Sequence, residues 1–182
     1  TGVFQYEGRA MRLVNDNLNP DNFYEVMLVN ALGRPGPLHN NATMYYIDIK
    51  NGHMQPDFSH PLYNPIVENT HHQVIFQEQI LRILREVGQF DWTSLAETRR
   101  IISHKEGEQA FNRKWKQFLK GATSQGMDEE TAQKVWGMCI TAGAYAFNAA
   151  HTISYGMIGL WCMYMKRHHP LEFYAAALRR LP

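Results

Sequence analysis

The sequence predicts a mainly α fold, built from many helices, with one long ordered excursion that includes a short strand. Apolar residues recur every three or four positions through several segments, and glycine or proline follows most of them. Of the 182 residues, 45% are hydrophobic and 19% are charged, a composition typical of globular proteins and not of disordered chains. This length is enough for one domain with its own core.

The first half of the chain alternates predicted helices with turns. One helix has Asp21 as its expected cap and Gly33 as its stop. The Arg-Pro-Gly-Pro run at 34–37 predicts a rigid turn, because proline fixes φ and glycine frees it. Residues 38–72 are rich in Asn, His, Pro and Gly, so they predict the long ordered excursion, with a strand-like run at 44–49.

The second half is predicted to be helical nearly throughout. One apolar stripe at helical spacing runs from residue 74 to 88, and Ser94 with Glu97 forms a capping-box pattern that opens the next helix. An apolar helix from about His151 to Lys166 is predicted to be buried, and a last helix follows Pro170. The large residues expected in the core include Trp115, Trp136, Met138, Trp161 and Met163.

Several functional classes do not fit the sequence. The aspartates are scattered, so no carboxylate cluster for a catalytic metal site is expected in this chain. The apolar stretch Ile153–Met165 is shorter than the roughly 20 residues that span a bilayer, so no membrane partner is expected. Cys139 and Cys162 are far apart and predict free thiols in a reducing compartment, here the cytoplasm. The chain also starts in mid-pattern, which indicates a piece of a larger protein.

The helix that follows Ser94 carries two adjacent arginines with two open interpretations. Arg99 is four residues from Leu95 and is predicted to share an apolar face with it and with Ile102, partly buried. Arg100 flanks it. The pair is either a surface pair whose stems pack on apolar neighbours, or a clamp for a triphosphate, because guanidinium groups give bidentate bonds to phosphate.

A polar and aromatic cluster at 143–156 has a similar ambiguity. Asn148, His151 and Tyr155 are spaced to share one helical face. They form either a capped helix with a core histidine or the wall of a nucleotide pocket, where rings stack and amides donate. A basic amphipathic segment is either a solvated helix face or a contact for a phosphate backbone; its cations are Arg113, Lys114, Lys116 and Lys120.

Seven stretches resemble one family in order and in spacing. They are GVFQYEGRAM, NALGRPGP, YNPIVENT, VIFQEQIL, LAETRRIISHK, GAYAFNAAHTISY and HHPLEFYAAAL. Together they resemble the fingers region of bacterial replicative DNA polymerase III alpha subunits, the C-family polymerases. The resemblance spans nearly all of residues 1–182, and it implies a multi-helix fingers domain, part of a nucleotidyltransferase that replicates DNA.

The resemblance also implies roles for individual residues. The positions that match the family's nucleotide-binding residues are Arg99, Arg100, Lys105, Tyr145, Phe147, Asn148 and His151. The positions that match the family's residues near nucleic acid are Arg34, Gln77 and Gln79. The four cations of the basic segment are candidates for DNA from their own pattern and not from the resemblance. Two departures stand out: Ala149 replaces a usual lysine, and Ile101-Ile102-Ser103 replaces a small Ala-Met-Gly run.

The resemblance implies partners outside this chain. The expected ligands are a deoxynucleoside triphosphate and primer-template DNA. A palm domain with aspartates and Mg²⁺ is expected before this region, together with other domains of the polymerase and, through other regions, a sliding clamp. The isolated chain is therefore expected to be inactive. The alternative is a stand-alone helical protein, such as a phage accessory factor, that binds nucleic acid or assists assembly without polymerising.

Overall fold

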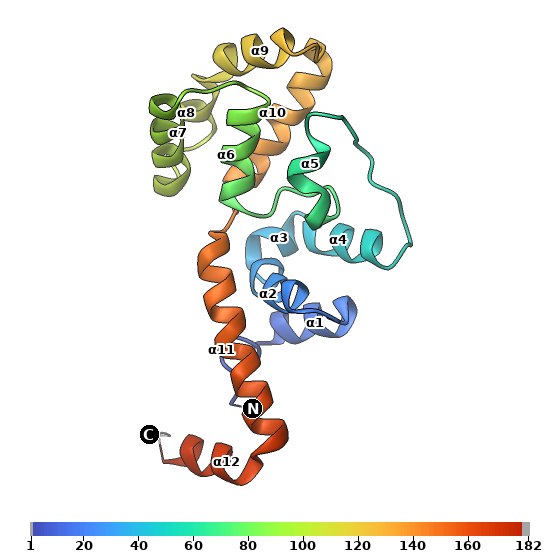
Figure 1. Cartoon of the computed structure of the whole chain (residues 1–182), viewed down its shortest axis with the longest axis vertical. Helices are drawn as coiled ribbons and strands as arrows, with labels where there is room; N and C mark the ends of the chain where they lie inside the picture. The colour runs from blue at the N-terminus through green and yellow to red at the C-terminus, as the bar shows by residue number, and fades with distance from the viewer. Residues whose placement is uncertain (1, 180–182) are drawn as a thin grey trace. The chain divides into compact units, whose positions relative to one another are not determined.

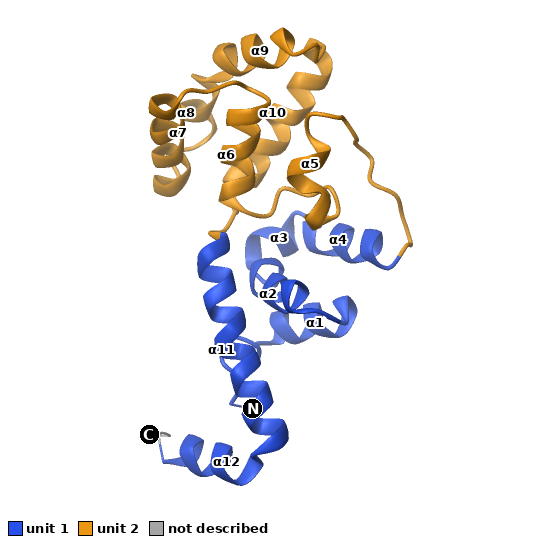
Figure 2. Cartoon of the chain, viewed as in Figure 1, with its two compact units in different colours: residues 1–51, 149–182 blue, residues 52–148 orange. Residues whose placement is uncertain are grey.

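The computed structural model describes residues 2–179, and the named elements among them are all helices, with no strand (Figure 1). The helices group into two compact units (Figure 2). Unit 1 comprises residues 1–51 and 149–182, and unit 2 comprises residues 52–148. The mainly α prediction is confirmed.

Unit 1 is organised around α2 and α11, which pack against each other. Small residues make this close packing possible: a Cβ on Gly156 would lie 2.9 Å from the Cβ of Met27. Lys50 and Glu25 form a largely buried ion pair at 2.6 Å, which ties α4 to α2. The helices of unit 1 are α1 (Arg9–Leu18), α2 (Phe23–Leu32), α3 (Pro35–His39), α4 (Ala42–Lys50), α11 (Ala149–His168) and α12 (Pro170–Leu178).

The strand predicted at 44–49 is wrong, because these residues lie within helix α4. The run is β-branched and aromatic, but Thr43, Tyr46 and Ile47 fall at helical spacing and are buried together. The Thr43 hydroxyl also donates to the Leu32 carbonyl at 2.8 Å. Burial of one helical face therefore overrides the local preference for strand.

Two helix starts in unit 1 also differ from the sequence prediction. The Arg-Pro-Gly-Pro run is not a turn: Pro35 is the first residue of α3, where its missing N–H costs nothing. The cap of α2 is Asn22 and not Asp21, because the Asn22 side chain accepts from the Glu25 N–H. Gly33 is confirmed as the stop of α2.

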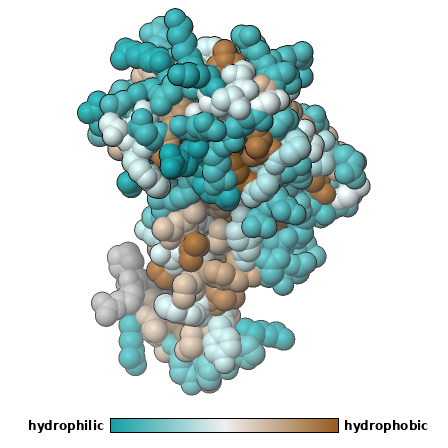
Figure 3. Space-filling view, turned by 45° about the horizontal axis from the view of Figure 1, so that its top comes forward, coloured by the Kyte–Doolittle hydropathy of each residue, from teal (hydrophilic) through white to brown (hydrophobic). Residues whose placement is uncertain are grey.

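Helix α11 is present as predicted but is not buried. Its buried residues are Thr152, Gly156 and Gly159, which form the face toward the rest of unit 1. Trp161 is 60% exposed, so its predicted place in the core is wrong. Apolar side chains reach the surface along this helix (Figure 3). No helix among residues 2–179 is both long and apolar enough to cross a membrane.

Unit 2 has one apolar core, in which α6, α9 and α10 meet. Phe118 is fully buried in it, with its ring centroid 5.0 Å from that of Trp136. The Trp136 indole N–H donates to Asn112 Oδ1 at 2.9 Å. The elements of unit 2 are α5 (Asn64–Val67), the 3-10 helix η1 (Glu68–Thr70), α6 (Gln77–Glu86), α7 (Trp92–His104), α8 (Glu108–Asn112), α9 (Trp115–Ser124) and α10 (Glu129–Gly143).

The starts of α7 and α10 are both capped by aspartate. Asp91 accepts from the Ser94 N–H at 2.7 Å, so α7 begins earlier than the Ser94–Glu97 capping box predicts. Asp128 accepts from the N–H and the hydroxyl of Thr131 at the start of α10. The position of α7 matters for function, because this helix carries both candidate arginines.

Candidate functional site

Helix α7 directs Arg99 and Arg100 to different sides. Its buried stripe is Leu95, Thr98 and Ile102, three positions on one helical face. Arg99 is one position beyond Thr98, about 100° further around the helix, and it is exposed. The predicted partial burial of Arg99 is therefore wrong. Each arginine lines a different cleft of unit 2.

Arg99 lines a cleft of about 440 Å³ between α6 and α7. Four residues of each helix line it, and on both helices they are spaced one or three positions apart. They are Leu81, Arg82, Arg85 and Glu86 of α6 and Trp92, Leu95, Ala96 and Arg99 of α7. Sequence reasoning missed Arg85 and Trp92 as candidate functional residues. No sequence pattern singles them out, because apolar spacing predicts which face of a helix is buried but not which exposed residues line a cleft.

Arg100 lines a second cleft, of about 600 Å³, on the other flank of α7. Arg113 and Lys114, which link α8 to α9, line the same cleft. Two carboxylates accompany these cations: Glu97 forms an ion pair with Lys114, and Glu106 lies 4.0 Å from the Arg100 Nε. The structure thus brings Arg100, which was predicted to bind the nucleotide, together with Arg113 and Lys114, which were predicted to bind DNA.

The remaining lysines of the predicted sites lie outside both linings. Lys105 ends α7 in a left-handed conformation, with φ of 51°, and its side chain is exposed. Lys116 and Lys120 are exposed one turn apart on α9, so they share a face. That spacing leaves two solvated cations on one helical surface.

The segment before α11 is fixed by backbone hydrogen bonds to the start of α6. Phe147 donates to the Ile75 carbonyl at 3.2 Å and accepts from the Gln77 N–H at 2.9 Å, a parallel bridge beside Phe76. The Gln77 side chain adds a bond to the Ala146 carbonyl at 3.3 Å. Tyr145 packs against the unit 2 core, and this burial raises the pKa of its hydroxyl.

Gln79 was predicted to contact DNA, but its side chain lies in the interior of unit 2. Its side chain is only 8% exposed. Its Oε1 accepts from the N–H groups of Ile75 and Phe76, each at 2.9 Å, and its Nε2 donates to the Thr70 hydroxyl at 2.7 Å. The amide is used at both ends inside unit 2, so it is not available for DNA.

His151 and Arg34 belong to unit 1. The His151 ring stacks on Tyr155 with centroids 3.8 Å apart, as their spacing on α11 predicts. Asn148 precedes α11, so the predicted helical face does not include it. Arg34 donates to the Asn30 carbonyl at 2.9 Å, and partial burial lowers its pKa.

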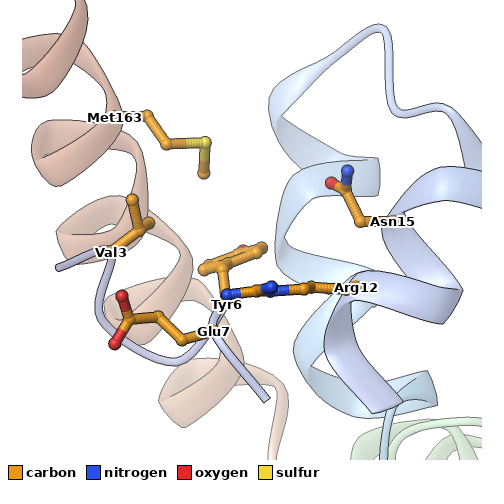
Figure 4. A pocket seen from close by; sticks show the side chains of 6 residues that line it. All are labelled: Val3, Tyr6, Glu7, Arg12, Asn15 and Met163. Carbon is orange, nitrogen blue, oxygen red and sulfur yellow. The ribbon is translucent and has the colours of Figure 1, made fainter. Parts of the chain in front are cut away.

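Unit 1 has a hollow of its own, of about 360 Å³, and no predicted site residue lines it (Figure 4). Tyr6 projects into it, and its hydroxyl donates to the Val26 carbonyl and accepts from the Asn30 amide. Burial raises the pKa of the Tyr6 hydroxyl. Across residues 2–179, no three His, Cys, Asp or Glu side chains are grouped so as to hold a metal ion.

Comparisons with known proteins agree on one family. Residues 1–126 match the family model of the bacterial DNA polymerase III alpha subunit finger domain. The chain is 38% identical over 176 residues to DNA polymerase III subunit alpha of Halalkalibacterium halodurans. It is 34% identical over 178 residues to that of Aquifex aeolicus and 33% identical over 178 residues to that of Bacillus subtilis. These alignments cover 97%, 98% and 98% of this chain, but only 16%, 15% and 16% of the relatives.

Proposed function

Because the chain belongs to the finger-domain family of bacterial DNA polymerase III alpha subunits, we propose that it binds the incoming deoxynucleoside triphosphate and primer-template DNA during replication. It would do so as a region of a larger polymerase, beside a palm domain and other domains. The observation that carries the proposal is the cleft shared by Arg100, Arg113 and Lys114.

The chemistry of this cleft suits a triphosphate. Arg100 is 72% exposed, and its nearest carboxylate is at 4.0 Å, so its guanidinium keeps donors for phosphate oxygens. Arg113 forms no salt bridge with any of the described residues. The lining holds three cations and two carboxylates, so its net positive charge favours a polyanion.

Phosphoryl transfer also needs metal ions, and the residues described here do not fit a metal centre. Two-metal chemistry uses carboxylates that hold cations a few ångströms apart. No such group exists among residues 2–179. The proposed contribution of this chain is therefore to bind and orient the triphosphate, while the Mg²⁺ ligands would belong to the palm.

Lys116 and Lys120 are the proposed contacts for the DNA backbone. They are exposed on one face of α9, where phosphate groups can reach them. Such contacts release counterions, so the affinity falls as salt rises. Because the net charge of the chain is only +1, the affinity should be weak at physiological salt. A sliding clamp would bind through other regions of the polymerase.

The test of the nucleotide site is calorimetric titration of the chain with dATP. EDTA is present, so that only the chain neutralises the phosphates. Arg100→Ala should weaken binding by roughly ten- to a hundredfold, since one charged hydrogen bond contributes about 1.5–3 kcal/mol. Arg167→Ala, an exposed arginine at the end of α11, is the matched control and should bind normally. Equal binding by all three proteins would refute the proposal.

A second measurement concerns catalysis. The purified chain should extend no primer in magnesium or manganese, because its described carboxylates form no metal site. Robust extension that survives removal of trace polymerase would contradict this division of labour between the fingers and the palm.

A further inference from the structure

The cleft between α6 and α7 contains an exposed aromatic ring that is held in place. Trp92 is 75% exposed at the first position of α7. The Arg85 guanidinium carbon lies 5.0 Å from the centre of its ring, and Arg85 is itself fixed by a bond to the Phe90 carbonyl. One face of the indole is therefore covered by a cation while most of the side chain stays in solvent.

The charges of this cleft favour an anion. Arg82 donates to both carboxylate oxygens of Glu86, at 2.9 and 3.2 Å, so these two charges cancel. Arg85 keeps its charge while it covers Trp92. Arg99 forms no salt bridge with a described residue and lies at the other end of the α7 stripe, seven positions from Trp92. The cleft thus carries two uncompensated positive charges along an apolar floor that includes Leu81 and Leu95.

We propose that this cleft binds single-stranded DNA, with an unpaired base stacked on Trp92 and a backbone phosphate at Arg99. Every base has a π face, and base stacking on an exposed ring is the usual device of proteins that hold single strands. An apolar helix is a poorer occupant, because it would remove the Arg85 and Arg99 guanidinium groups from water without supplying an anion.

The inference builds on the proposed function, because it adds a second nucleic-acid contact to the same polymerase region. It also separates the two arginines that the sequence presents as a pair. Arg100 serves the triphosphate in one cleft, and Arg99 serves the strand in the other. The unpaired template is the single strand that a polymerase on primer-template DNA always presents.

The test compares two fluorescein-labelled oligonucleotides of equal length, one oligothymidylate and one abasic, by anisotropy with the whole chain. Trp92→Ala should raise the Kd for oligothymidylate by roughly five- to a hundredfold, because stacking is lost. It should leave the Kd for the abasic strand unchanged, since that strand has no base to stack. Trp92→Phe should restore much of the difference.

Two controls separate this site from general effects. Trp161→Ala removes another exposed tryptophan, in unit 1, and should change neither Kd. Arg99→Ala should weaken both oligonucleotides and lower the salt slope by about one. Circular dichroism checks that each variant is folded. Folding is expected because Trp92, Arg99 and Trp161 are all exposed.

Two outcomes would overturn the inference. One is a Trp92→Ala variant that binds oligothymidylate normally or weakens both strands equally. The other is a chain that binds no oligothymidylate even at low salt, which would leave the cleft to an apolar peptide. Loss of dATP binding in Arg100→Ala is measured separately, so either proposal can fail while the other holds.

Discussion

The two units use apolar helices in opposite ways. In unit 2, the large apolar residues converge on one core, where Phe118 and Trp136 are almost completely buried. In unit 1, α11 turns small residues such as Gly156 toward α2, and its bulky ones, including Trp161, reach solvent. An apolar helix thus shows which residues can be buried, while the neighbouring helices decide which face is covered.

The tryptophans give the sharpest contrast and the largest expected effect. Trp136→Ala should lower the free energy of unfolding of unit 2 by about 3–5 kcal/mol, since it opens a cavity and leaves Asn112 Oδ1 without its donor. Trp161→Ala should change stability by less than about 0.5 kcal/mol, as is usual for an exposed position. Urea denaturation followed by far-UV circular dichroism measures both, and equal losses would erase the distinction between the units.

Two glycines sharpen the comparison inside unit 2. A Cβ on Gly121 would collide with the backbone carbonyl of Gly88, so Gly121→Ala should destabilise the unit by about 1–3 kcal/mol or more. Gly137 has nothing within 4 Å of its missing Cβ. Gly137→Ala should stabilise α10 by about 0.5–1 kcal/mol, because alanine favours helix.

The same urea titration distinguishes these two variants. A stable Gly121→Ala protein would mean that α9 can move away from the residues after α6 without loss of packing. A destabilised Gly137→Ala protein would mean that a neighbouring group contacts the added methyl group, contrary to the open space at Gly137.

The smallest expected effect is the loss of stability in acid. It differs between the units because α10 of unit 2 is capped by an aspartate, which titrates, and α2 of unit 1 by an asparagine, which does not. Hydrogen bonds from Thr131, first from its hydroxyl and then from its N–H, hold the Asp128 pKa below its usual value of about 4 in the folded chain. The unfolded chain therefore takes up this proton first as pH falls. The stabilisation is present above the ordinary aspartate pKa and is lost as pH falls through the lowered one.

Asp128→Asn tests that sign. Asparagine keeps a capping oxygen but does not titrate, so the variant should lose part of the decline in the unit 2 urea midpoint between neutral and acidic pH. Asn22→Asp introduces a titrating cap into α2 of unit 1 and should add acid sensitivity there. A wild-type pH profile in Asp128→Asn would contradict the assignment.

Sequence alone anticipated most of the helices and where several of them stop. It failed where tertiary packing outweighs local preference, as in the β-branched run around Tyr46, which is helical because one face is buried. It also failed at the burial of α11. No local pattern could show that Gly156 and Gly159 form the covered side and that Trp161 lies outside.

The sequence predicted single candidate residues for the site but not how they are arranged. Arg100 and Arg113 were assigned to different ligands, yet they line one cleft. Gln79 was assigned to DNA, yet its amide closes a loop in the interior. Trp92 was missed altogether, because an aromatic at a helix start carries no sign of exposure in the sequence.

The rotation between consecutive helical positions also has an evolutionary consequence. Arg99 and Arg100 are adjacent codons, yet they line separate clefts. Under the two proposed assignments, selection on one ligand can act at one codon without disturbing the other, so the proposed strand contact and the proposed nucleotide contact can change independently. A single-residue insertion early in α7 would instead turn both side chains by about 100°, and both proposed contacts would be lost in one event.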